Sequence, residues 1–170
     1  MYDPLPQPAV PSGVPSGGRA VGEFRWLLDR FLDQTPGILD VAVVSADGVL
    51  LSRAALPEAV APELAAPIAS GVAALAAAGS QLLAAPAAQR TVVEMQHCVL
   101  IVMAVGDGSM LAVSADAAVD RAVLGYEMTR LVRRVGQVLT PALRDTLRRS
   151  ADGTHPRTDG SGTHPRTGAA

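Results

Sequence analysis

The stretch ILDVAVVSADGVLLS, residues 38–52, contains two apolar runs separated by the pair Asp47-Gly48. Both runs are rich in β-branched residues, and an Asp-Gly pair between such runs indicates a β-hairpin, because glycine adopts the positive φ of a tight turn. The first run, 38–45, is apolar almost throughout, as in a central strand covered on both faces. An Asp-Gly pair can also border a calcium site, but no further oxygen ligands follow at calcium-loop spacing. The stretch therefore predicts a hairpin that carries no chemistry.

Three more apolar runs follow later in the chain. They are TVVEM (91–95), CVLIVMAV (98–105) and MLAVS (110–114), and only short turns separate them. Such spacing predicts an antiparallel meander, with 91–95 at an edge of the sheet. The second turn contains Gly106-Asp107-Gly108, which resembles the start of a dinucleotide fingerprint. That fingerprint needs a third glycine and a following helix, so we interpret this turn as a hairpin as well.

Segments with helical periodicity stand before, between and after these strands in the sequence. Apolar residues recur at three- and four-residue steps in three segments: Phe24, Leu27, Leu28, Phe31 and Leu32 in the first; Leu64, Ile68, Val72, Leu75 and Leu82 in an Ala-rich segment at about 60–84; and Leu124, Met128, Leu131, Val135 and Val138 in the last, at about 117–139. Pro67 is expected to bend or delay the second helix, and Thr140-Pro141 to begin a short additional helix. The order predicts an α+β sandwich: a five-stranded antiparallel sheet, α-β-β-α-β-β-β-α, with helices on both faces.

Composition excludes several classes of function. The chain has 170 residues, 49% of them hydrophobic, with a formal net charge of -2 and 3% aromatic residues. These values argue against nucleic acid as the main partner. The Ala-rich helix is interrupted by Gly and Ser, so it is expected to be too weakly apolar for a membrane span. All 14 basic residues are Arg; the absence of Lys excludes a Walker-type phosphate site, a Schiff-base enzyme and a kinase.

Both ends of the chain have a composition typical of disorder. Residues 1–20 are rich in Pro, Gly and Ser, and the tail 151–170 contains GTHPRT twice, at 153–158 and 162–167. One domain is therefore expected at 21–150. The two histidines of the tail lack a third ligand and make a poor metal site. The start has no features of a signal peptide, and the single Cys98 cannot form an internal disulfide, so we expect a cytoplasmic protein.

Two groups of residues could suggest catalysis. His97 precedes Cys98, but neighbouring strand residues point to opposite faces, and we expect Cys98 to be an inert core residue. The arginines 130, 133, 134, 144, 148 and 149 could supply a charge to a GTPase in trans, but a solvated helix face is the preferred interpretation. We therefore predict no catalytic, cofactor-binding or metal-binding residues.

Four segments, in order and with the right spacing, resemble the roadblock / dynein light chain family, and more closely its bacterial, actinobacterial branch. They are FRWLLDRFLDQTPGILDVAVVSADGVLL (24–51), TVVEM (91–95), VMAVGDGSMLAV (102–113) and VLTPALRDTL (138–147). The resemblance implies a profilin-like sandwich that forms homodimers through edge-to-edge pairing of the third strand and packing of the second helices. The interface residues expected from it are Leu75, Leu82, Thr91, Val92, Val93, Glu94 and Met95.

The resemblance also implies the function: a non-enzymatic regulator or scaffold for a Ras-like small GTPase, which either stimulates GTP hydrolysis or localises the GTPase. Relatives are encoded beside a sensor histidine kinase and a small adaptor, which are the further expected partners. The alternative is a small-ligand sensor with a pocket between sheet and helix. One structural test is Val93→Pro, which should remove a backbone donor from the pairing edge and give a monomer.

Overall fold

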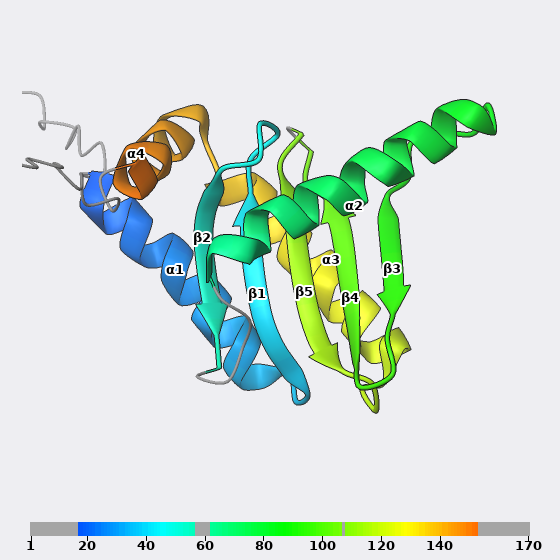
Figure 1. The fold of residues 1–170 in the computed structure, drawn as a ribbon. Coiled ribbons are helices and arrows are strands. Elements are labelled where there is room, and N and C mark those ends of the chain that lie inside the picture. Colours follow the sequence, from blue (N-terminus) through cyan, green and yellow to red (C-terminus); the bar gives the residue numbers. More distant parts are fainter. Residues whose placement is uncertain (1–16, 57–61, 107, 153–170) are drawn as a thin grey trace, which may run out of the picture.

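The computed structural model describes residues 17–56, 62–106 and 108–152, and the elements occur in the expected order (Figure 1). The elements are α1 (Gly17–Gln34), β1 (Ile38–Val44), β2 (Leu50–Ala55), α2 (Pro62–Leu82), β3 (Arg90–Glu94), β4 (Cys98–Ala104), β5 (Met110–Asp116), α3 (Arg121–Val138) and α4 (Pro141–Asp152). The predicted disordered segments lie largely outside the described residues, but α1 begins at Gly17 and α4 ends at Asp152, so both helices extend past the expected limits of the domain.

The five strands form one antiparallel sheet in the order β2-β1-β5-β4-β3. The predicted α+β sandwich is thereby confirmed. The hairpin at Asp47-Gly48 is present, with φ +83° at Gly48. The chain crosses the sheet through α2 before it enters β3, so β3 lies at the edge opposite β2. The predicted edge position of this strand is confirmed.

Two apolar cores cover the two faces of the sheet. Alternate residues of the central strands, such as Val41, Val43 and Val113, pack with α1, α3 and α4 in the larger core. The smaller core lies under α2 and contains Val44, Ala66, Ala69, Val102, Met110 and Ala112. Figure 1 shows α2 crossing one face of the sheet and α1 and α3 lying behind the other. The helices therefore cover both faces, but with very different amounts of apolar side chain.

The second helix begins at Pro62 and continues through Pro67, so the proline does not delay its start. Proline lacks the N–H that would otherwise bond to the carbonyl oxygen of Glu63, one turn earlier in the helix. Pro67 lies only five positions after the first residue of α2 and is exposed. Its ring therefore does not disturb the contact between α2 and the sheet.

Candidate functional site: an open strand edge beside an exposed apolar helix

The outer side of β3 is an open edge: among the described residues, β3 pairs only with β4. The hydrogen bonds at the two ends of this pair fix which residues face β4. Met95 N donates to Cys98 O at 2.9 Å, and Ala104 N donates to Gln89 O at 3.2 Å. Backbone groups alternate between the two sides of an antiparallel strand. The backbone N–H and C=O groups of residues 89, 91, 93 and 95 therefore point to β4 and bond to it.

The same alternation turns the N–H and C=O groups of Arg90, Val92 and Glu94 outward. These groups can receive another strand, which is how an exposed edge associates. The proposed test at Val93 is corrected by this register, because the Val93 N–H points to Leu100 on β4. Val93→Pro would break the sheet of one subunit, whereas Val92→Pro removes a donor from the open edge.

The side chains of β3 divide between the two faces of the sheet. Thr91, Val93 and Met95 lie on the α2 face, where they line the space beneath that helix. Val92 lies opposite Ile101 of the other core and is 42% exposed. The Glu94 carboxylate forms an ion pair with Arg121 of α3 at 3.1 Å. The five predicted edge residues are thus neighbours, but only Thr91, Val93 and Met95 share a face with α2.

The large apolar side chains at the C-terminal end of α2 and just after it are exposed. Leu75, Leu82 and Leu83 are 76%, 86% and 75% exposed, whereas the small residues Ala66 and Ala69 are buried. Figure 1 shows the C-terminal part of α2 extending past β3, beyond the area that the sheet can cover. Alanine allows the helix to approach the sheet closely, so the leucines remain outside. We call β3 together with Leu75, Leu82, Leu83 and Met95 the β3–α2 surface.

The sequence predicted Leu75, Leu82 and Met95 for this surface and missed Leu83. Leu83 follows the last helical residue, so a search for helical periodicity does not include it. Leu64 and Ile68 are also exposed, at 47% and 44%. Steps of four and seven residues separate Leu64, Ile68, Leu75 and Leu82, so the four side chains lie on one stripe of the helix. Ile68, at the edge of this stripe, also lines the groove between α2 and the sheet.

The composition of α2 corrects one expectation. Glu63–Leu82 is long and apolar enough to cross a membrane by length and composition, and 11% of that stretch is buried. The interpretation that it is too weakly apolar was therefore wrong. In the fold, one face of the helix rests on the sheet through alanines, and Leu75 and Leu82 of the opposite stripe have little cover among the described residues.

A groove of about 330 Å³ lies between α2 and the sheet, where the alternative function places a ligand. Its lining is apolar except for Asp40, Cys98 and Ser114. The Asp40 carboxylate accepts two hydrogen bonds from Arg53 Nε, at 2.9 and 3.0 Å, and one from Arg53 Nη2, at 2.8 Å. Cys98 is half-buried and contacts Met95 Sδ at 3.8 Å, so the prediction of a core cysteine was wrong. Its strand lies next to the edge, where the sheet is only partly covered.

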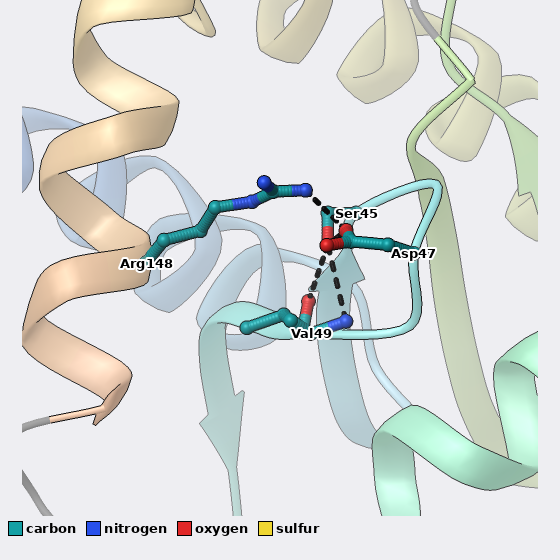
Figure 2. Close-up of polar contacts among 4 residues, drawn as sticks. All are labelled: Ser45, Asp47, Val49 and Arg148. Carbon is teal, nitrogen blue, oxygen red and sulfur yellow. Dashed lines mark hydrogen bonds and ion pairs between the residues drawn. The ribbon is translucent and has the colours of Figure 1, made fainter.

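The hairpin at Asp47 is a structural turn joined to α4 (Figure 2). Ser45 Oγ donates to Asp47 Oδ1 at 2.5 Å, and Val49 N donates to Ser45 Oγ at 3.1 Å. Arg148 of α4 donates to Asp47 Oδ1, so the turn is joined to a residue 101 positions away. No group of three potential metal ligands occurs among the described residues. The polar atoms at this turn bind one another.

The Ser45 hydrogen bond, aided by the Arg148 charge, holds the pKa of Asp47 below its ordinary value of 3.8. A lowered pKa means that the charged carboxylate stabilises the fold above that value, and that this contribution disappears as the pH falls through the folded-state pKa. Asp47→Asn should therefore lower the melting temperature slightly at pH 7, and the difference from the unmodified chain should close below about pH 4. Asp33→Asn, an exposed change on α1, is the control. A difference that persists unchanged at acid pH would contradict a role for the Asp47 charge.

The six arginines considered for catalysis do not gather at one place. Arg148 binds the hairpin, Arg149 Nε donates to Asp145 O at 3.2 Å, and Arg130 pairs with Glu127 at 3.2 Å. Arg133 and Arg134 are exposed on α3. Arg130, Arg133, Arg134 and Arg149 thus lie on solvated helix faces, as interpreted. Arg144 and Arg148 are half-buried, and Arg148 pairs with a distant segment, so the interpretation was wrong for these two.

The fold and this surface define a class of protein: an α+β sandwich with an open edge strand beside an exposed apolar helix. The chain belongs to the Roadblock/LC7 domain family, whose pattern matches residues 24–115. No curated protein matches the sequence.

Solved structures with the same fold include three that are informative. A Roadblock/LC7 domain from Streptomyces avermitilis is 32% identical, with a TM-score of 0.62, over 68% of this chain and 96% of that one. MglB from Myxococcus xanthus is 16% identical, with a TM-score of 0.64, over 75% and 91%. A structure described as MglB with a tetrameric arrangement is 20% identical, with a TM-score of 0.60, over 79% and 96%. The last two similarities concern the fold.

Proposed function

We propose that this chain is a homodimeric, non-enzymatic regulator or scaffold in which two copies pair through the β3–α2 surface. The observation that carries the proposal is the exposure of Leu75 and Leu82 next to an edge strand with outward N–H and C=O groups. An open apolar edge promotes uncontrolled association unless a specific partner covers it. Antiparallel pairing of β3 with its copy would satisfy the edge groups and bring the two α2 helices together.

The pairing can be tested with two proline substitutions at adjacent positions. Val92→Pro removes an outward N–H and should weaken dimerisation while the subunit stays folded, because an edge strand tolerates proline at such a position. Val93→Pro removes the donor to Leu100 and should instead destabilise the subunit by about 1–3 kcal/mol. Sedimentation measures the mass and urea unfolding the stability. If Val92→Pro leaves the dimer intact, the interface lies elsewhere.

The partner that we propose for the dimer is a Ras-like small GTPase in the cytoplasm. Support comes from membership of the Roadblock/LC7 family and from the absence of Lys, which prevents this chain from being a P-loop GTPase itself. A sensor histidine kinase and a small adaptor encoded nearby complete the proposed system. The dimer would dock the GTPase and either stimulate its GTP hydrolysis or localise it.

The experiment is a pull-down in which the full chain captures the Ras-like GTPase that is encoded near it. The GTPase is loaded either with GDP or with a GTP analogue. We expect retention in one nucleotide state above the other, and measurement of GTP hydrolysis with and without the chain then distinguishes stimulation from localisation. Equal retention in both states, or none in either, would contradict the proposal.

The alternative function, a small-ligand sensor, rests on the groove beneath α2. Its apolar lining would accept a hydrophobic molecule, but the polar atoms of Asp40 already bond to Arg53. A ligand would therefore have little to fix its orientation. A thermal-shift screen with cell metabolites would favour this alternative if one compound raised the melting temperature in a saturable way.

A further inference from the structure

A second surface lies on the opposite face of the sheet, between α1 and α3. A groove of about 460 Å³ is lined there by Leu27, Arg30, Phe31, Gln34, Thr35, Glu127, Arg130, Leu131 and Arg134. Phe31, Thr35 and Leu131 are buried, whereas the three arginines are exposed. We call this the α1–α3 groove. It is separate from the β3–α2 surface, so pairing of two copies there would leave it accessible.

The charge of the α1–α3 groove is positive in a protein that is negative as a whole. Three guanidinium groups line it against one carboxylate, that of Glu127, which pairs with Arg130 at 3.2 Å. The formal net charge of the chain is -2. Guanidinium groups present planar, forked donors that match carboxylates. The groove therefore favours a ligand rich in carboxylates.

Aromatic rings hold two of these arginines in place. The Arg30 guanidinium lies 5.2 Å from the centre of the Trp26 ring, and that of Arg130 lies 5.8 Å from the Tyr126 ring. Trp26 is 56% and Tyr126 64% exposed. Stacking limits the side-chain freedom that is lost when a partner binds. Trp, Tyr and Arg are also the residues most enriched at the energetic centres of protein interfaces.

We propose that the α1–α3 groove binds an acidic segment of another protein, with the carboxylates on Arg30, Arg130 and Arg134 and apolar side chains over Leu27 and the two rings. The ends of this chain do not have the required charge. Residues 153–170 contain two Arg and one Asp, and residues 1–16 contain one Asp. The occupant that we propose is therefore a segment of a separate protein and neither of these two segments. This proposal does not depend on the dimer or on the GTPase.

Trp26 is the single tryptophan of the chain, and its ring contacts the guanidinium of Arg30, which lines the groove, so its fluorescence reports on binding there. The probe is a synthetic helical peptide with Glu on one face and Leu on the other, and the comparison peptide has Lys in place of Glu. Titration of the full chain with the Glu peptide should change the Trp26 emission in a saturable way, with weaker binding at high salt. The Lys peptide should leave the emission unchanged.

Two matched charge reversals locate the binding. Arg30→Glu/Arg130→Glu changes two arginines of the groove, and Arg25→Glu/Arg133→Glu changes two exposed arginines of the same helices that do not line it. Both variants have the same net charge. We expect the first to weaken binding of the Glu peptide by about tenfold or more and the second by less than about twofold. If the Arg30→Glu/Arg130→Glu variant does not fold, Arg30→Gln/Arg130→Gln replaces it, because it removes the same two charges without adding new ones.

Three results would overturn the proposal. They are no binding of the Glu peptide by the unmodified chain, equal weakening by both reversals, or tighter binding of RNA or anionic vesicles in the groove with no competition from the peptide. The second result would mean that the overall charge of the protein, and not the α1–α3 groove, attracts the peptide.

Discussion

Leu75→Asp/Leu82→Asp should convert the protein from a dimer to a folded monomer. Both side chains are more than three-quarters exposed in the single subunit, so their replacement does not disturb a core. A twofold interface contains each residue twice. Burial of one leucine contributes about 1.5–3 kcal/mol, so the loss of four should raise the dissociation constant by about 10⁴-fold or more. Buried, unpaired aspartates would add to the loss.

The control for this change is Val123→Asp/Val138→Asp, which places the same charges on α3. Val123 and Val138 are 54% and 36% exposed and lie on a helix of the opposite face of the sheet. Sedimentation equilibrium over a range of concentrations should give a dimer for the control and a monomer for the leucine variant, and circular dichroism checks that both are folded. Dissociation by both variants to the same extent would mean that added charge acts without regard to position.

Arg53→Met should lower the free energy of unfolding by about 3 kcal/mol. The Arg53 and Asp40 side chains are only 13% and 11% exposed and form a forked ion pair between β2 and β1. Methionine keeps much of the volume of the arginine stem but leaves the Asp40 carboxylate buried and without that partner. The cost comes from this unpaired charge and is much larger than the net contribution of the intact pair.

The double variant Asp40→Leu/Arg53→Met separates these two effects. With both charges removed, the stability should return to within about 1 kcal/mol of the unmodified chain, because an apolar pair replaces the ion pair. The groove beneath α2 has space for the leucine next to Ala42. Urea unfolding at one fixed protein concentration measures all three proteins, since the proposed dimerisation would make stability depend on concentration. A double variant as unstable as Arg53→Met would show that packing, and not the unpaired charge, causes the loss.

Local sequence patterns predicted the elements and their order correctly, for physical reasons that can be named. Turn residues such as Gly48 fixed the hairpins, and the apolar stripes of α1 and α3 lie on the sheet as periodicity indicated, except that Val138 is exposed. The edge position of β3 followed from the meander, because its strands pair in sequence order and the crossover through α2 precedes it.

Periodicity did not predict which stripe of α2 meets the sheet. Its alanines and its leucines are both apolar, and hydrophobicity alone favours burial of the larger side chains. The structure buries Ala66 and Ala69 instead, because a close approach of the helix to the sheet requires small residues. Leu75 and Leu82 stay exposed on the single subunit. In a chain that associates, the most hydrophobic stripe of a helix need not face its own core.

Contacts between distant segments also could not be predicted from the sequence. The bond from Arg148 to Asp47 depends on where α4 packs, and the α1–α3 groove depends on how two helices separated by most of the chain lie together. Each of these arginines, taken singly in the sequence, is indistinguishable from a solvated one. Only the fold places Arg30 and Arg130 beside the same groove, each stacked on an aromatic ring.

The pairing of β3 with its copy is tested most directly by amide hydrogen exchange along that strand. The amides of Thr91 and Val93 bond to β4 and should exchange slowly in any folded subunit, so they are the internal reference. The outward amides of Arg90, Val92 and Glu94 should exchange slowly in the unmodified chain and rapidly in Leu75→Asp/Leu82→Asp. Rapid exchange of these three amides in the unmodified chain, with Thr91 and Val93 still protected, would contradict the account.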